Sequence, residues 1–452
     1  MEDGLLFELP DDRPSQPVAK PPRIGNKRIR HAVRNQIEFH ECSLDELLPD
    51  DDQARVVWSY VCDLDLSELI EPIQSVESGP GQPQADPRIL MALWLHATLR
   101  GVGTARELDR LCKRHVAYQW LCGGVSMNYH SLADFRVAHG ELLDRLLTHS
   151  VAVLMAEGLV TLDRVAQDGM KVRASAGAAS FRRQPTLEEA LQEAEVQVRT
   201  LRAEVESDPA ATTKRQQAAR QRAATERTER VQAALAQLPQ IAAAKKAKER
   251  DKARASTTDP DARVMKMGDG GFRPAFNVQF ATATDSQIIT GVEVINSGGD
   301  QGQLLPMAEQ HEERYEEAPK EMLGDGGFVK KDDIEQLAPP QGGTVVYAPV
   351  MKSKDPNIDP HTPRDGDSPA VVEWRQRMAT PEAKEIYKQR ASTAECVNAL
   401  ARNRGLQRFN VRGLPKARAI VLWYVLAHNL MRAVALRAAK AAMRAVAAPE
   451  TG

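Results

Sequence analysis

Apolar positions recur at helical intervals through the first third of the chain. In the stretches 86–97 and 104–112, apolar residues return every three or four positions, and short glycine-containing breaks follow each helical run. Asn128 or Ser131 is positioned to cap a further helix, because both side chains accept hydrogen bonds from free backbone N–H groups. The pattern predicts a helical region over 36–155. Compact helices joined by tight turns fit either a helix-turn-helix-like domain or a plain helical bundle.

A seven-residue apolar repeat extends from 186 to 206. Its members alternate at intervals of four and three: Leu187, Leu191, Ala194, Val198, Leu201 and Val205. Thr186 and Glu189 have the spacing of a capping box. After a break at 207–209 a second helical run reaches about 254, with an interruption at Pro239. We predict an antiparallel coiled-coil hairpin over 183–255, inserted into another domain and serving assembly rather than chemistry.

Beyond the hairpin the apolar period changes from helical to alternating. The predicted order is two strands, a helix that Asp300 caps, a strand that ends at Asp325, a helix, a strand, a loop and a long helix; the ranges are 276–282, 287–294, 301–317, 322–325, 330–337, 344–349, 352–368 and the residues around Glu395. A further strand ends at Asp168 before the hairpin. Alternating strands and helices indicate an α/β domain whose mixed sheet is covered on both faces.

The chain therefore divides into five predicted parts. A flexible basic arm (1–35) precedes the helical region (36–155), which we interpret as DNA-binding. The catalytic α/β domain spans 156–182 and 256–432, and the hairpin (183–255) interrupts it. A helical tail follows at 433–452.

Three acidic residues in three different settings are the strongest chemical signal. Asp168 and Asp325 each close an apolar run, and Glu395 lies within a helical pattern. Two carboxylates at strand ends and a third on a helix can converge to hold two divalent cations, and hard cations with oxygen ligands serve phosphodiester chemistry. At 100° per residue, Glu395, Asn398 and Arg402 fall on one stripe of their helix.

Each acid has a competing interpretation. Asp168 fits a turn before a glycine. Asp-Gly-Gly-Phe occurs twice, so Asp269 rivals Asp325, although its polar surroundings favour a turn. Glu382 and Glu385 are neighbours of Glu395, and Glu385 lies well off its stripe. An ordinary Glu–Arg pair on a solvated helix is the simpler alternative for Glu395.

Charge matters here through its distribution, since the formal net charge is only −2. Residues 13–34 carry seven Lys and Arg with no acid, and residues 402–418 carry six with no acid. Such stripes suit a phosphate backbone, and a solvated face is an equal alternative.

Five scattered cysteines indicate reduced thiols in the cytoplasm. No signal peptide is evident, and the apolar stretch 419–431 is too short to span a bilayer, so we expect a soluble protein with no membrane partner.

These motifs resemble those of DDE transposases of bacterial insertion sequences, in the group that contains the IS-four and IS-five families and closest to the IS-eleven-eighty-two group. The resemblance covers nearly the whole chain; the residues that carry it are 44–49, Phe135-Arg136, Gln167-Asp168-Gly169, Asp325-Gly326-Gly327-Phe328 and the helix with Tyr387, Arg390 and Glu395. Related groups have Tyr-x2-Arg-x3-Glu-x6-Lys. Here the Arg-to-Glu gap is one residue longer, and Arg402 stands where Lys is expected.

The resemblance implies a ribonuclease H-like catalytic domain and a transposase that cleaves DNA and transfers strands. Asp168, Asp325 and Glu395 would hold two Mg²⁺ ions, for which Mn²⁺ can substitute, and in-line attack on the phosphodiester would follow. The expected DNA contacts are Tyr387, Arg390, Arg402, Arg404 and Arg408. The partners would be element ends, target DNA and a second copy in a dimer on DNA, in the nucleoid of the bacterial cytoplasm.

Two other classes of protein remain open at this point. One is a non-catalytic DNA-binding protein derived from a transposase. The other is a structural coiled-coil protein, which would leave the acids and the basic stripes without a role.

Overall fold

Helices dominate the described residues up to 156. The computed structural model describes residues 41–75, 84–207, 214–340, 342–352, 355 and 357–447; the predicted arm at 1–35 and its basic stripe lie outside these ranges. The helices are α1 (Leu44–Leu47), α2 (Gln53–Cys62), α3 (Ser67–Ile70), α4 (Pro87–Leu99), α5 (Ala105–Arg114), α6 (Val116–Cys122), α7 (Tyr129–Ala138) and α8 (Gly140–Ala156). Asn128 caps α7 by accepting from the His130 and Ser131 N–H groups. The predicted helical pattern is thus confirmed.

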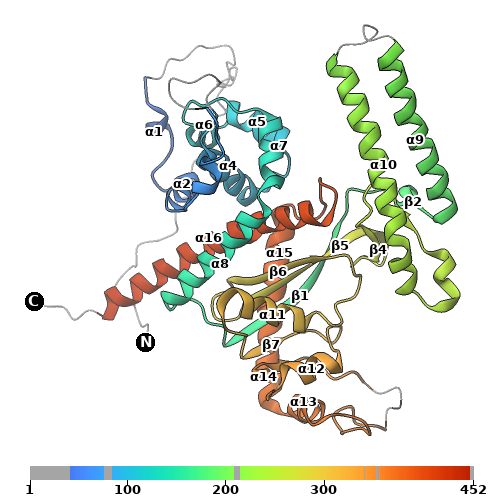
Figure 1. Ribbon diagram of the computed structural model, residues 1–452. Coiled ribbons are helices and arrows are strands. Elements are labelled where there is room, and N and C mark those ends of the chain that lie inside the picture. Colours follow the sequence, from blue (N-terminus) through green and yellow to red (C-terminus); the bar gives the residue numbers. More distant parts are fainter. Residues whose placement is uncertain are drawn as a thin grey trace, which may run out of the picture. The chain divides into compact units, whose positions relative to one another are not determined.

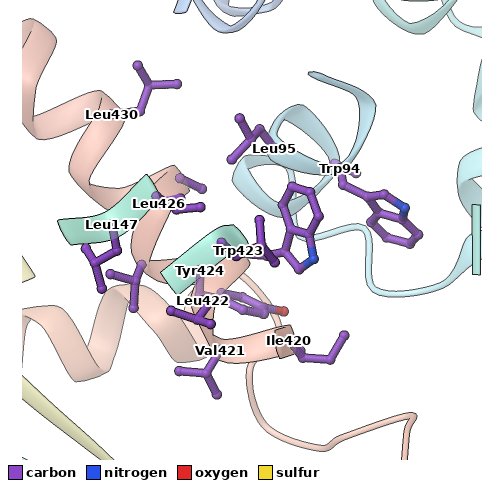
Figure 2. Close-up of a cluster of buried hydrophobic side chains, with 14 of the residues drawn as sticks. Trp94, Leu95, Leu147, Ile420, Val421, Leu422, Trp423, Tyr424, Leu426 and Leu430 are labelled. Carbon is purple, nitrogen blue, oxygen red and sulfur yellow. The ribbon is translucent and has the colours of Figure 1, made fainter. Parts of the chain in front are cut away.

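The last helix, α16 (Leu414–Ala447), is buried between the N-terminal helices and the sheet. It packs against α4, α7 and α8 as well as strand β6 (Ile289–Ile295). Figure 2 shows its apolar side chains gathered with Trp94 and Leu95 of α4 and Leu147 of α8. Trp423 is fully buried there, and its indole N–H donates to the Arg136 carbonyl at 2.9 Å.

At 34 residues, α16 is much longer than the apolar stretch 419–431 and passes unbroken through position 432, where the sequence pattern separates a tail. Its length and composition alone would allow it to cross a membrane. However, 72% of its most apolar window is buried inside the protein, which is the position of a core helix.

The main sheet is mixed and has β1 near its centre. Its strands are β1 (Arg164–Arg173), β4 (Arg263–Lys266), β5 (Phe272–Ala283), β6, β7 (Glu321–Leu323) and β8 (Val345–Tyr347). The order is β4-β5-β1-β7-β8, and β6 pairs with β5. Strands β1, β5 and β6 pair antiparallel, whereas β1, β7 and β8 pair parallel. The predicted α/β class is confirmed.

The register places Asp168 and Asp325 at the same level of the sheet. The parallel pairing of β1 with β7 ends at Ala166 and Leu323, and each aspartate lies two residues beyond its strand's last partner. The sequence predicted that strand β1 ends at Asp168, and that prediction is wrong. The strand continues to Arg173 because β5 supplies antiparallel partners along this whole length.

Alternate residues of β5 face different layers. Phe276, Val278 and Phe280 join the core around α16, whereas Ala281 joins the core around α11 (Leu304–Tyr315). Asp168 pairs with Phe280, and Gly169 pairs with Gln279. The two neighbours therefore face opposite sides of the sheet, because successive residues of a strand alternate. The sheet is covered on both faces, as predicted.

The remaining helices follow β7 and β8. They are α12 (Lys331–Leu337), α13 (Pro369–Ala379), α14 (Pro381–Arg390), a π-helical segment (Ala391–Glu395) and α15 (Cys396–Asn403). Thr380 caps α14 through its hydroxyl, and Pro381 occupies the first turn. The last three elements form one continuous helical rod that carries Arg390 and Glu395.

Two long helices form a hairpin between β1 and β5 (Figure 1). They are α9 (Gln184–Ser207) and α10 (Lys214–Ala243), with 3₁₀ turns at Ala178–Ser180 and Ala247–Lys252 on either side. A short ladder of β2 (Phe181–Arg182) and β3 (Ala255–Ser256) joins the two ends. Leu187, Val231, Ala234 and Leu238 form part of its apolar seam.

Three local predictions about the hairpin are corrected. Helix α9 begins at Gln184, before Thr186, so Thr186 lies inside the helix rather than at its cap. Pro239 does not interrupt α10, which continues to Ala243. The second helix also ends about ten residues earlier than the composition indicates, because the segment after Ala243 leads into a 3₁₀ turn. Coiled-coil packing stays a prediction.

Candidate functional site

Arg390, at the end of α14, gathers the three predicted acids around its guanidinium. Its Nη2 lies 3.2 Å from Asp168 Oδ1 and 3.8 Å from Asp325 Oδ2, and its Nη1 lies 3.7 Å from Glu395 Oε1. The Arg390 side chain is only 11% exposed. Three carboxylates and one guanidinium leave this small volume with negative charge, which attracts cations.

The π-helical segment explains how Glu395 reaches this group. In a regular α-helix, residues five apart are offset by about 140°, so Arg390 and Glu395 would face different directions. A π-turn has i→i+5 geometry, which places the fifth residue above the first. The segment Ala391–Glu395 supplies that turn. It absorbs the extra residue between Arg390 and Glu395, and both side chains face the same site.

Asp168 is the most completely held of the three acids. Its Oδ1 accepts from the Gly169 N–H at 3.0 Å and from Arg390, and its Oδ2 accepts from Asn398 Nδ2 at 2.9 Å. Burial raises the pKa of Asp168, and the Arg390 guanidinium and the Gly169 N–H oppose this rise. Charged Asp325 and Asp300 raise it further.

Asp325 and Glu395 are more open to solvent. Asp325 accepts from the Gly327 N–H at 2.7 Å, and buried Phe328 anchors the same turn. The Asp325 side chain is 43% exposed and that of Glu395 is 65% exposed. Both can therefore reorient toward a ligand more freely than Asp168. Tyr387 is half-buried beside the three acids, and its burial raises the pKa of the phenol.

The donor set fits a hard divalent cation in its chemistry, since it consists of carboxylate oxygens. Arg390 already satisfies these oxygens with positive charge. Within the described part of the chain, no group of three or more His, Cys, Asp or Glu side chains has the spacing to hold a metal ion. In this structure the Arg390 guanidinium lies within 4 Å of all three carboxylates.

The competing acids lie elsewhere. Asp269 occupies the turn between β4 and β5, where it accepts from the Gly271 N–H and pairs with Arg273 at 2.7 Å. Glu385 pairs with Lys388 on the exposed side of α14, and Glu382 lies in the first turn of that helix. The turn interpretation of Asp269 is confirmed.

Arg390 lies at the acids, but the other three predicted basic contacts, Arg402, Arg404 and Arg408, are not gathered there. Arg402 is exposed at the end of α15, and burial lowers the pKa of Arg404. Arg408 is exposed in a segment that pairs with the end of β1, where the Phe409 N–H donates to the Arg173 carbonyl. None of the three forms an ion pair with the acids among the described residues.

Sequence reasoning missed the roles of two residues. Asn398 lies on the predicted stripe, and the structure shows that its buried amide holds Asp168. Asp300 was expected to cap a helix, yet α11 begins at Leu304 and its cap residue is Gln303. Asp300 instead accepts from the amides of Asn277 and Gln279. Two amides at alternate positions of a mostly apolar strand were the available signal.

Two protein families match parts of the chain. Residues 42–138 match the family described as Transposase domain (DUF772), which covers most of the N-terminal helices. Residues 362–434 match the family described as Transposase DDE domain, which includes Tyr387, Arg390, Glu395 and Asn398. Asp168 and Asp325 lie outside both matched ranges. No curated protein and no solved structure matches the chain.

DDE transposase domains generally use divalent metal ions, and transposases act on DNA. The two matches lie at opposite ends of the chain and both name transposases, so they indicate an insertion-sequence transposase and support one of the DDE type.

Proposed function

We propose that this protein is a transposase that cleaves DNA at the ends of its element and transfers the freed ends into a target. The observation that carries the proposal is the convergence of Asp168, Asp325 and Glu395 on Arg390, from two strands and a helix that are distant in sequence. The closest group by resemblance is IS-eleven-eighty-two. In this proposal the protein works in the bacterial nucleoid and acts as a dimer on DNA.

A ribonuclease H-like fold is part of the proposal. Three antiparallel strands, β6-β5-β1, followed by two parallel strands, β7 and β8, support it. In this arrangement the first strand is central, and a ligand site forms where the parallel strands end. Asp168 and Asp325 lie at that edge.

Asp168, Asp325 and Glu395 are the residues that would hold two Mg²⁺ ions, or Mn²⁺ in their place. When bound, such ions activate water or a 3′-hydroxyl and stabilise the leaving oxygen. Asn398 and the Gly169 N–H keep both Asp168 oxygens in a fixed orientation. Arg390 balances the acids, and its position among them allows it to pair with a phosphate.

The basic stripe at 402–418 is the proposed track for the DNA backbone. Arg402 follows the Glu395 turn on α15, and Arg408 is exposed beyond it. Arg404 is half-buried, so its contribution to DNA binding is expected to be the smallest of the three. Tyr387 lies beside the acids and would contact the strand that reacts. Phosphate contacts of this kind position DNA without reading its sequence.

A non-catalytic DNA-binding protein is the alternative. It has no need of three carboxylates held around one arginine, nor of a π-turn that brings the third into place. Metal-dependent strand cleavage separates the two possibilities directly.

The test is Mg²⁺-dependent nicking of a supercoiled plasmid that carries the gene with its flanking DNA. Asp325→Asn is expected to abolish nicking, and Asp269→Asn, in the second Asp-Gly-Gly-Phe motif, is its matched control. Glu395→Gln is paired in the same way with Glu385→Gln on the same helical rod. DNA binding by gel shift should survive in all four variants. Normal nicking by Asp325→Asn or Glu395→Gln would refute the assignment of that acid.

A further inference from the structure

Asp300 lies behind Asp168, on the opposite face of the sheet. It follows β6 and precedes α11, and its Oδ1 accepts from Asn277 Nδ2 and Gln279 Nε2, both at 2.7 Å. Both amides belong to side chains of β5 that are 0% exposed. Because each amide presents its N–H to the same oxygen, that Asp300 oxygen is the acceptor of both hydrogen bonds.

This contact is part of a chain of polar groups that crosses two strands, and its members Gln167, Asn277 and Gln279 are fully buried. Gln279 Oε1 accepts from Gln167 Nε2 at 3.2 Å, and the same nitrogen donates to the Gln303 carbonyl at 2.9 Å. Gln167 lies on β1, and Gln303 directly precedes α11. The chain therefore ties β1, β5 and the start of α11 together beside Asp168. Hydrogen bonds made by buried side chains such as Gln167 and Gln279 give a defined geometry to the backbone that they link.

Gly169 is the point at which this network touches the catalytic strand. A Cβ at Gly169 would lie 2.7 Å from Gln279 Nε2 and closer still to Asp300 Oδ1. Real Cβ atoms do not approach polar atoms this closely, so only glycine lets the carboxylate pack onto the strand. The N–H of the same glycine donates to Asp168 Oδ1. One residue thus contacts Asp300 on one face and holds Asp168 on the other.

We propose that Asp300 is a positioning residue for Asp168, which it orients by clamping the Gly169 backbone through Asn277 and Gln279. The inference rests on the proposed function, because it assigns Asp168 to the reaction. Asp300 does not contact the reacting groups. It sets the direction of the Gly169 N–H and, through it, the orientation of the Asp168 carboxylate toward a cation. Partners of this kind typically change metal affinity or rate 10–100-fold.

The test uses the full chain and three measurements: steady-state nicking with Mg²⁺ over a range of DNA concentrations, Mn²⁺ binding by calorimetry, and the thermal midpoint. Asp300→Asn is expected to lower kcat and Mn²⁺ affinity by ~10-fold or more, with KM for DNA unchanged. The control is Asp333→Asn, which removes a carboxylate that is 1% exposed and paired with Lys330. It should lower the thermal midpoint at least as much and leave kcat and Mn²⁺ affinity at the wild-type values.

A reciprocal exchange tests the clamp itself. The double variant Asp300→Asn with Asn277→Asp restores one carboxylate–amide bond in the reverse direction, so it should recover most of the lost kcat. A wild-type kcat and Mn²⁺ affinity in Asp300→Asn, or no recovery in a folded double variant, would overturn the proposal. If Asp300→Asn does not fold, Gln279→Leu removes one arm of the clamp. A wild-type kcat in that variant would also overturn the proposal.

The outcome for the unaltered protein separates the two proposals. If it nicks DNA and binds Mn²⁺ while Asp300→Asn does so equally well, only the role of Asp300 fails. If the unaltered protein does neither, the proposed function itself fails.

Discussion

Asp259 is a buried carboxyl whose removal should stabilise the protein at neutral pH. It is 0% exposed, its Oδ1 accepts from the Gly413 N–H at 3.1 Å, and its Oδ2 has no hydrogen-bond partner. Burial raises the pKa of Asp259 from its ordinary 3.8 to about 6. The Gly413 N–H opposes the rise in pKa, the Asp261 carboxylate adds to it, and the Asp261 N–H and Arg412 oppose it.

The magnitude follows from linkage between ionisation and folding. A folded pKa of about 6 against an unfolded value of 3.8 means that the folded state prefers the protonated carboxyl. That preference contributes its full stabilisation of the folded state below pH 3.8, and this stabilisation is lost as the pH rises through 6. Ionised Asp259 then costs ~3 kcal/mol at pH 7, at 1.36 kcal/mol for each pKa unit. About one third of this cost is present at roughly pH 4.5.

The assay is urea unfolding of the wild type and of Asp259→Asn at several pH values from about 4.5 to 7.5. The amide cannot ionise, so the stability of the variant relative to the wild type should rise by ~2 kcal/mol across this range. Asp332→Asn is the control, because Asp332 is exposed in the first turn of α12 and is not among the groups that shift the pKa of Asp259. A difference between Asp259→Asn and wild type that stays constant with pH would refute the reasoning, since it would mean that Asp259 does not titrate differently in the folded state.

Three further predictions concern the site and the core. Gly169→Ala should abolish nicking and lower the free energy of unfolding by ~1–3 kcal/mol, because its Cβ would overlap the Asp300 carboxylate; nicking and urea unfolding check this. Deleting Ser392 should convert the π-turn to an α-turn and retain nicking, whereas deleting Ala399, in α15 beyond Glu395, should abolish it; equal activity of the two deletions would contradict the geometry. Trp423→Ala should cost ~3–5 kcal/mol in urea unfolding, because the side chain is fully buried between helices.

The sequence predicted the fold class and the three acids through local patterns. Asp325 was separable from Asp269 because one follows an apolar run and the other a polar one, and the structure places them at a strand end and in an exposed turn. Such distinctions depend on a few neighbouring residues. Whether Asp168, Asp325 and Glu395 catalyse remains a prediction.

What escaped the sequence depends on distant partners. β1 continues beyond Asp168 because β5, more than a hundred residues later, pairs with it to Arg173. The role of Asp300 likewise depends on the amides of Asn277 and Gln279, which face it only once β5 lies beside β1. Local propensity also misjudged α10, where Pro239 is accommodated within a continuous helix.

The π-turn between Arg390 and Glu395 changes how the spacing of a motif should be counted. An inserted residue normally rotates everything after it on a helix, and a function that depends on one face is lost. Here the widened turn confines the insertion to a few residues, and the rod continues in its former direction through α15. Chains with three or four residues between the arginine and the glutamate can thus share one site geometry. Relatives of this protein should be aligned by helical turn rather than by residue number, because a search with a fixed gap would miss those whose gap differs by one residue.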